Sequence, residues 1–138
     1  MEDRFLNSEA RERQFAALGS PGSKMYMGLE IFPNPGCAVV QLEFDELMCK
    51  CPITGQPDWY SGTIVLAATD NLIESKSLKL FFHNIIESTF TKNMGLFGEA
   101  LAVYIRDQLR EALDAEENEV HVILKQKSRG GISITAHA

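Results

Sequence analysis

The sequence predicts an α+β domain, in which an antiparallel sheet of four strands carries two helices on one face in the order ββααββ. Three observations lead to this prediction. Short segments with alternating or β-branched residues lie towards both ends of the chain, two longer segments with helical spacing lie between them, and turn-forming clusters separate the segments. The length of 138 residues suits one domain of ordinary size.

The first two strands are predicted from their residue types. Residues 37–44 are rich in Val and Leu, and residues 60–69 have three β-branched residues at their centre. Residues 47–57 are predicted to form a loop between these strands, because two prolines and a glycine exclude a continuous helix or central strand there.

Two helices follow. Asp70 or Asn71 is expected to cap the first helix, with Glu74 in its first turn. The apolar stripe of this helix comprises Leu78, Phe81, Phe82, Ile85 and Ile86. After a break near residues 93–95, a second helix is predicted for residues 97–113, with its apolar side formed by Leu101, Tyr104, Ile105, Leu109 and Leu113.

The last two strands close the predicted sheet. Residues 119–125 alternate between polar and apolar, as in a half-buried strand, and residues 132–135 form the final strand after a turn at Arg129-Gly130-Gly131. The first residues are polar or turn-forming, so we expect an arm over residues 1–24 and a single domain over residues 25–138.

Composition excludes several classes of protein. The net charge is −6, with 19 acidic and 13 basic residues, which argues against a protein whose main task is to grip a nucleic-acid backbone. No apolar run is long enough for a membrane span, and the charged N-terminus is unlike a secretory signal. A domain of this size has little room for a deep pocket, so a site shared between subunits is expected.

The three cysteines, Cys37, Cys49 and Cys51, are an odd number without a signal peptide, which indicates a reducing cytoplasmic compartment. Cys49 and Cys51 form a C-x-C pair, but the histidines show no matching ligand spacing, so no metal site is expected.

Cys51 and Asp58 are the strongest candidates for catalysis. A thiol reacts as a thiolate, and a carboxylate held nearby can take and return its proton. Two prolines and a glycine between the residues make the chain turn, which can hold both groups in one pocket. The plainer alternative is a buried, inert cysteine beside a turn aspartate.

Three basic residues are candidates for binding phosphate. Lys76 and Lys79 share a face near a predicted helix start, where backbone N–H groups and the helix dipole also favour anions. Arg129 carries a forked donor beside two glycines. The alternatives are a solvated charged face for the lysines and an ordinary hairpin turn for the Arg-Gly-Gly sequence.

Together, these segments resemble the NADPH-dependent 7-cyano-7-deazaguanine (preQ0) reductases of queuosine biosynthesis, in their short, single-module form. The matching stretches span residues 29–133 and are Leu29-Glu30-Ile31-Phe32-Pro33-Asn34, Cys51-Pro52-Ile53-Thr54-Gly55-Gln56-Pro57-Asp58, Glu74-Ser75-Lys76-Ser77-Leu78-Lys79-Leu80-Phe81 and Arg129-Gly130-Gly131-Ile132-Ser133. The two central motifs are long and specific. The resemblance implies the tunnelling fold (T-fold), in which ββααββ subunits form rings with active sites between neighbours.

The resemblance also implies roles for individual residues. Cys51 would attack the nitrile carbon to give a covalent thioimide, and Asp58 would donate and accept protons. The remaining implied contacts are the deazaguanine pocket, formed by Ile73, Glu74, Ser75 and Glu99, and the NADPH phosphates, met by Lys76, Lys79 and Arg129.

The implied reaction converts preQ0 to 7-aminomethyl-7-deazaguanine (preQ1), a step towards a modified tRNA nucleoside. It would use two NADPH per turnover and no metal. The implied partners are a small deazapurine and other copies of the chain, with no direct contact to nucleic acid or membrane.

One departure concerns the start of the second helix, where many family members have His-Glu and this chain has Gly98-Glu99. The missing imidazole puts one substrate hydrogen bond in doubt. His83 could substitute from the first helix, although a surface histidine is the plainer reading. The segment between the helices, residues 86–96, also looks longer than usual.

Two other functions are open at this point. One is a preQ0-directed amidinotransferase, which would use the same cysteine without NADPH. The other is a non-catalytic T-fold protein that binds a deazapurine, for which Gly98 is the only support.

Overall fold

The computed structural model describes residues 28–91 and 95–138. The predicted arm over residues 1–24 lies outside the described part of the chain. The main sheet has four antiparallel strands in the order β2-β3-β5-β6, formed by Val39–Lys50, Pro57–Ala67, Val120–Gln126 and Thr135–His137. Helices α2 (Ser75–Thr91) and α3 (Gly98–Leu113) come between β3 and β5 in the sequence. The α+β class and the order ββααββ of the main sheet are confirmed.

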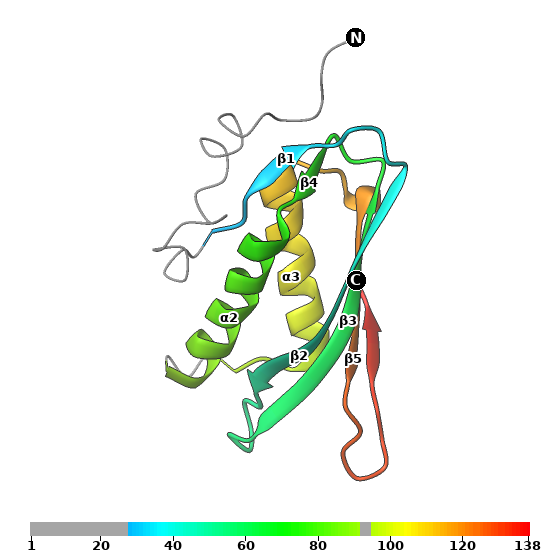
Figure 1. The fold of residues 1–138 in the computed structure, drawn as a ribbon. Coiled ribbons are helices and arrows are strands. Elements are labelled where there is room, and N and C mark those ends of the chain that lie inside the picture. The colour runs from blue at the N-terminus through cyan, green and yellow to red at the C-terminus, as the bar shows by residue number, and fades with distance from the viewer. Residues whose placement is uncertain (1–27, 92–94) are drawn as a thin grey trace.

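Both helices lie on one face of the main sheet, side by side (Figure 1). Helix α2 packs against β2, and α3 packs against β5. The core between helices and sheet contains side chains with no exposed surface, among them Ile64, Leu101, Ile105, Leu109 and Val122. These are the positions that alternate along the strands and recur with helical spacing in the sequence, so burial of one apolar face explains both patterns.

Strand β2 runs further than the sequence predicts. Residues 47–50 belong to the strand, so the prediction of a loop over residues 47–57 is wrong in its first part. A register shift between Phe44 and Leu47, with Glu46 at a φ of 60°, forms a bulge that lets the strand bend and continue. The connection between β2 and β3 is therefore only residues 51–56.

A second, two-stranded sheet was not predicted. Strand β1 (Ile31–Pro33) pairs with β4 (Asn71–Ile73), with Ile31 opposite Ile73. Because β4 occupies the residues before α2, the predicted cap at Asp70 or Asn71 is wrong. The cap is Glu74 instead, since its carboxylate accepts the backbone N–H groups of Lys76 at 2.8 Å and Ser77 at 2.7 Å.

Candidate active site

Cys51 is the first residue of the tight connection between β2 and β3. Its N–H donates to the carbonyl of Gln56 at 2.8 Å, and its own carbonyl accepts from the N–H of Gly55 at 3.0 Å. The N–H of Gln56 also donates to the Thr54 hydroxyl at 3.2 Å. These bonds fix the backbone on both sides of the thiol, which is half-buried.

Strand pairing places Asp58 beside this cysteine. Cys49 is directly opposite Asp58 in the register of β2 and β3, and Cys51 follows two residues later as the first residue of the turn. The charge of Asp58 acts on the Cys51 thiol, so the two groups lie within electrostatic reach of each other. Their joint role in catalysis stays a prediction.

The turn favours the reactive form of the Cys51 thiol. The Thr54 hydroxyl, followed by the backbone N–H groups of Thr54 and Ile53, lowers the pKa of Cys51 from its ordinary value, against smaller opposing effects of burial and of the Asp58 charge. A cysteine with a lowered pKa in a partly exposed turn is the type that acts as a nucleophile. Cys49 differs, because it is fully buried and its Sγ lies 3.5 Å from the Leu96 carbonyl.

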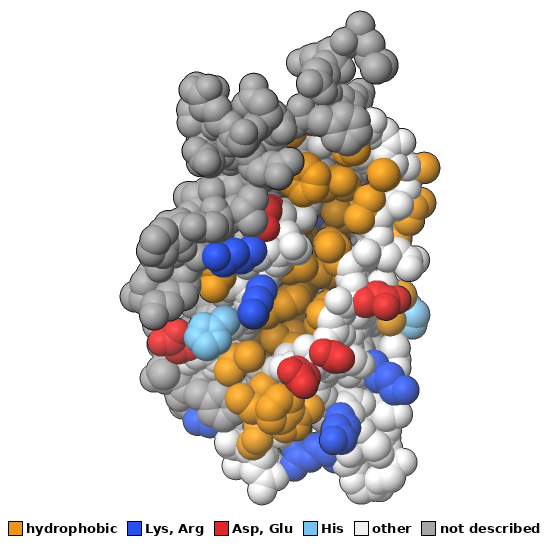
Figure 2. Space-filling view, in the orientation of Figure 1, with side chains coloured by type: hydrophobic (Ala, Val, Ile, Leu, Met, Phe, Trp, Pro, Cys, Tyr) orange, Lys and Arg blue, Asp and Glu red, His pale blue; other side chains and the backbone are white. Residues whose placement is uncertain are grey.

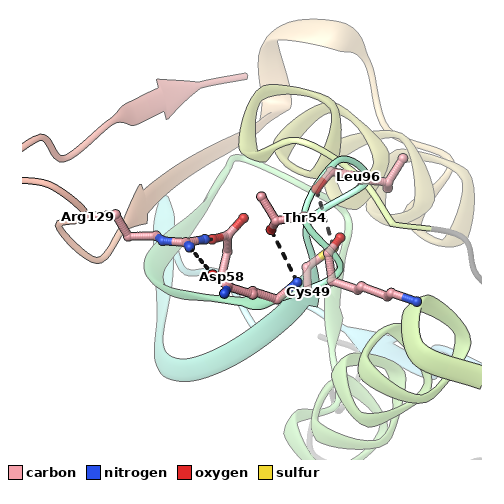
Figure 3. A network of polar contacts seen from close by, with 7 residues as sticks. Cys49, Thr54, Asp58, Leu96 and Arg129 are labelled. Carbon is pink, nitrogen blue, oxygen red and sulfur yellow. Dashed lines mark hydrogen bonds and ion pairs between the residues drawn. The ribbon is translucent and has the colours of Figure 1, made fainter.

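Asp58 is 5% exposed and forms an ion pair with Arg129, which reaches it from the connection between β5 and β6 (Figure 3). The second terminal nitrogen of Arg129 donates to Oε1 of Gln56 at 2.5 Å. Arg129 therefore joins the end of the Cys51 turn and the start of β3 to the far hairpin. In this arrangement its guanidinium is held by Asp58 and Gln56, and its contact with an NADPH phosphate stays a prediction.

Two glycines let Arg129 reach this position. Gly130 has a φ of 59° and Gly131 a φ of 82°, and the backbone groups of Arg129 and Ile132 exchange hydrogen bonds of 2.9 and 3.1 Å across them. Two consecutive residues with positive φ form the type of hairpin turn that suits glycine. The turn predicted from the Arg-Gly-Gly sequence is confirmed.

The start of α3 lies near this group of residues. Glu99 is exposed in the first turn of α3, where the helix dipole favours a carboxylate. Gly98 lies against the ring of Tyr60, because a Cβ atom built on Gly98 would be 3.0 Å from Cε1 of that ring. Cys51, Asp58, Arg129 and Glu99 thus occur at one end of the domain, together with Thr54 and Tyr60, two residues to which sequence reasoning gave no role.

The other predicted substrate residues lie at the start of α2. Ile73 is buried in β4, and Glu74 is 6% exposed with both carboxylate oxygens engaged in capping the helix. Ser75 is exposed at the first position of α2. Their predicted contact with the deazaguanine stays a prediction.

Lys76 lies in the first turn of α2, and Lys79 follows three residues later on the same side of the helix. Among the described residues, neither lysine forms an ion pair. Lys79 lines a cleft of about 430 Å³ between α2 and β2, together with Ser75 and His83. Figure 2 shows basic side chains and an imidazole gathered beside an apolar depression on this face. Because Glu74 takes the N–H groups of the helix start, an anion there would depend on the lysine side chains.

The candidate residues therefore form two groups. The first group, called the Cys51 group, comprises Cys51, Asp58, Arg129 and Glu99. It lies with the start of α3 at one end of the helical layer, whereas the start of α2 lies towards the other end (Figure 1). A helix of 17 residues is about 25 Å long, which is too far for one small ligand to bridge. His83 belongs to the α2 cleft and is exposed there.

In residues 28–91 and 95–138, no three or more His, Cys, Asp or Glu side chains are arranged to hold a metal ion. In the same ranges, no helix has the length and apolar character needed to cross a membrane.

Comparisons with known proteins give a consistent result. No protein-family model matches the chain. Three curated relatives, each named NADPH-dependent 7-cyano-7-deazaguanine reductase, are similar over most of its length. The protein from Frankia casuarinae is 37% identical over 120 residues, covering 86% of this chain and 90% of the relative. The one from Syntrophobacter fumaroxidans is 37% identical over 119 residues (84% and 72%), and the one from Syntrophus aciditrophicus 35% over 113 residues (80% and 75%).

A solved structure supports the fold. The archaeosine synthase QueF-Like, in its apo form, superposes with a TM-score of 0.58 and covers 75% of this chain and 93% of its own. Its sequence identity is 16%, so the likeness concerns the fold alone. It confirms the T-fold that the sequence resemblance implies for the subunit.

Proposed function

Because the chain belongs to the family of NADPH-dependent 7-cyano-7-deazaguanine reductases, we propose that it reduces the nitrile of preQ0 to the aminomethyl group of preQ1. The observation that carries this proposal is the Cys51 turn. It combines a thiol of lowered pKa with a buried carboxylate, Asp58, whose charge acts on that thiol.

Cys51 acts first in this mechanism. Its thiolate adds to the nitrile carbon, which forms a C–S bond and turns the C≡N triple bond into a C=N double bond. Asp58, which is a carboxylate in its ion pair with Arg129, accepts the proton of the thiol and returns it to the nitrile nitrogen. The product is a thioimide on Cys51, and a C=N bond accepts hydride far more readily than a nitrile.

NADPH, when bound, supplies hydride, and reduction of a nitrile to a primary amine requires two of them. After the first hydride reaches the carbon, the C–S bond breaks, and the Cys51 sulfur leaves as thiolate with an imine remaining in the site. The rigid turn at residues 51–56 keeps the sulfur in place for the next substrate. The site must exclude water until the second hydride arrives, because an imine hydrolyses readily.

Two cationic side chains fit the phosphates of NADPH. Lys76 and Lys79 are three residues apart on one face of α2, and no carboxylate of the described residues pairs with them. A charged ligand therefore displaces no internal salt bridge there. The lysines would hold the cofactor, and Glu99 would accept the N–H groups of the guanine-like edge with its two oxygens.

The separation of the two groups supports a site that neighbouring copies share. The start of α2 in one subunit would then complete the Cys51 end of another, so that Ile73, Glu74 and Ser75 line the pocket from the side opposite the thiol. In this proposal the chain works as a homo-oligomer in the cytoplasm, and preQ1 goes on to tRNA modification in queuosine biosynthesis.

The amidinotransferase alternative is not favoured. Such an enzyme needs the cysteine but no nicotinamide cofactor, and the names of the curated relatives specify NADPH. The non-catalytic alternative loses its support from Gly98, because in the structure this glycine makes room for Tyr60.

Mass spectrometry of the intact protein mixed with preQ0, without NADPH, tests the proposal. We expect a covalent adduct of the substrate's mass, which NADPH discharges while its absorbance falls. The Cys51→Ala variant should give no adduct, whereas Cys37→Ala, the matched control at an exposed cysteine, should react like the wild type. An unmodified wild-type mass would refute the covalent mechanism, and ammonia-dependent conversion of preQ0-containing tRNA without NADPH would favour the transferase.

A further inference from the structure

Tyr60 has a buried hydroxyl that the fold does not use. Its side chain is 3% exposed, and its Oη has no hydrogen-bond partner among the described residues. A buried hydroxyl without a partner reduces stability, and a phenylalanine would fill the same space without this cost. The hydroxyl is therefore unexplained by packing alone.

The position of the ring points this hydroxyl towards the site. Tyr60 follows Asp58 by two residues in β3, so both side chains lie on the helix-facing side of the sheet. The tip of the ring lies against the start of α3, because a Cβ atom on Gly98 would be 3.0 Å from Cε1 and 3.3 Å from Oη. Any larger residue at position 98 would meet the ring in its present place. The absence of a side chain at Gly98 thus allows Tyr60 to occupy the space before Glu99.

The charges around the hydroxyl keep it protonated. Burial raises the pKa of Tyr60, and the neighbouring Asp58, Cys49, Glu99 and Cys51 raise it further. Three of them have proposed roles: Cys51 is the nucleophile, Asp58 accepts its proton, and Glu99 accepts the N–H groups of the guanine-like edge. The Tyr60 hydroxyl is accordingly a neutral donor within electrostatic reach of Cys51, Asp58 and Glu99.

The chemistry of the substrate matches this placement. In 7-cyano-7-deazaguanine, the C6 carbonyl oxygen lies between the C7 nitrile and the N1–H edge. A ligand with its nitrile at Cys51 and its N1–H edge at Glu99 therefore presents this oxygen to the middle of the site. The oxygen is an acceptor and needs a donor there.

We propose that Tyr60 is a substrate-binding residue, whose hydroxyl donates a hydrogen bond to the C6 carbonyl oxygen of the deazaguanine. This assignment rests on the proposed function and adds a residue to it. It also explains how the chain manages without a side chain at position 98: the donor comes from strand β3 instead of helix α3.

The test compares Tyr60→Phe with the wild type, both in a Cys51→Ala background, by calorimetric titration with preQ0. Without the thiol, the titration reports reversible binding alone. We expect Tyr60→Phe to bind preQ0 about 5- to 30-fold more weakly, since it leaves the buried carbonyl oxygen without a donor. Thermal unfolding should show equal or higher stability, because the variant removes only an unpartnered hydroxyl.

Tyr104→Phe is the matched control. Tyr104 is a half-exposed tyrosine on α3 that stacks on Phe81, and its variant should bind like the parent. In the Cys51 background, Tyr60→Phe should raise the KM for preQ0 by a similar factor and leave the KM for NADPH unchanged. Equal preQ0 affinity with and without the Tyr60 hydroxyl would overturn this assignment alone. Failure of the parent protein to bind preQ0 would overturn it together with the proposed function.

Discussion

Three hydrogen-bond donors in the next few residues lower the pKa of Cys51. The Thr54 hydroxyl is the strongest of them, and the N–H groups of Thr54 and Ile53 add to it. The backbone bonds of residues 51–56 hold all three in place. The turn thus favours the thiolate although Asp58, a negative neighbour, opposes it. In the proposed mechanism, proton transfer to Asp58 and stabilisation of the sulfur charge would be tasks of different residues.

Replacement of Thr54 tests this arrangement. Thr54→Val keeps the shape of the side chain and removes the hydroxyl that lowers the pKa of Cys51. A thiol reacts above its pKa, so the pH midpoint of Cys51 alkylation should move to higher pH, and at neutral pH the rate should fall several-fold. Iodoacetamide labelling followed by peptide mass spectrometry measures this midpoint for Cys51 alone.

Thr54→Ser is the control for this experiment, because it retains the donor and should keep the wild-type midpoint. An unchanged midpoint in Thr54→Val would mean that the backbone N–H groups alone set the reactivity of the thiol. In that case the hydroxyl would serve only to accept from the N–H of Gln56.

Sequence reasoning proposed a catalytic pair from local residue types. Cys51 and Asp58 are seven positions apart across one turn, and residue types that force a turn indicate such a pair. The ion pair between Arg129 and Asp58 spans 71 positions, and no local pattern marks it. Sequence reasoning gave no role to Tyr60, which we propose to bind the substrate, for the same reason: its contact with Gly98 joins β3 to α3.

At the scale of elements, the bulge in β2 has the largest effect on the position of the candidate catalytic residues. Residues 47–57 were predicted to form a loop because they contain prolines and a glycine, but these loop-forming residues occur only in the second half of the segment. Before this segment, Glu46 adopts a positive φ, which a bulge can accommodate. Because the strand continues to Lys50, Cys49 stands opposite Asp58 and the thiol of Cys51 follows in the same register. An earlier strand end would leave no such register to place the thiol beside the carboxylate.

At the start of helix α2, different residues cap the helix and are available to bind an anion. Glu74 satisfies the helix N-terminus, so Lys76 and Lys79 are left for an external anion. The sequence pattern could not reveal this, because residues 71–73, which form β4, were predicted to belong to the start of the helix. The helix starts after Ile73 because β4 pairs with β1, and this pairing holds the chain in extended form up to Ile73.

Lys79→Gln tests the proposed phosphate contact. A charge-assisted bond to phosphate is worth about 1.5–3 kcal/mol, so the KM for NADPH should rise at least about tenfold. Added salt should narrow this difference, because it screens the wild-type attraction. Adduct formation with preQ0 in the absence of NADPH should not change.

Lys125→Gln serves as the control, since Lys125 is an exposed lysine of β5 outside the α2 cleft. Steady-state kinetics with each substrate in turn separates the two KM values. If Lys79→Gln altered the adduct and left the KM for NADPH unchanged, α2 would contact the deazaguanine instead of the cofactor.

At the scale of the whole molecule, apolar side chains are exposed around the Cys51 end. Large hydrophobic residues on the turn, on the start of β3, before α3 and on the β5–β6 hairpin remain open in the single chain, namely Ile53, Trp59, Phe97, Ile132 and Ile134. Apolar groups concentrated in this way are typical of a surface that another protein covers. Contact with a second copy would bury them and bring in the missing side of the site.

The order of strands and helices could be predicted from the periodicity of apolar residues, because burial of one face of each element imposes this periodicity on the sequence. The assembly does not follow in this way, since residues at an interface look like ordinary surface residues until the fold places them. The two separate groups of candidate residues are what a site shared between subunits would look like in a single chain. A shared site requires the Cys51 group and the α2 lysines to come from different subunits.

Mixing two inactive variants tests this requirement. Subunits with Cys51→Ala lack the thiol, and subunits with both Lys76→Ala and Lys79→Ala lack the phosphate contacts. If the residues meet only across an interface, random co-assembly gives about a quarter of sites with both groups intact, and activity should return to about that fraction. Mixing Cys51→Ala with Asp58→Asn is the control, because these residues lie in one chain and no site regains both. Activity equal to the sum of the unmixed variants in both mixtures would place the whole site within one subunit, and α2 would then have to move towards the thiol.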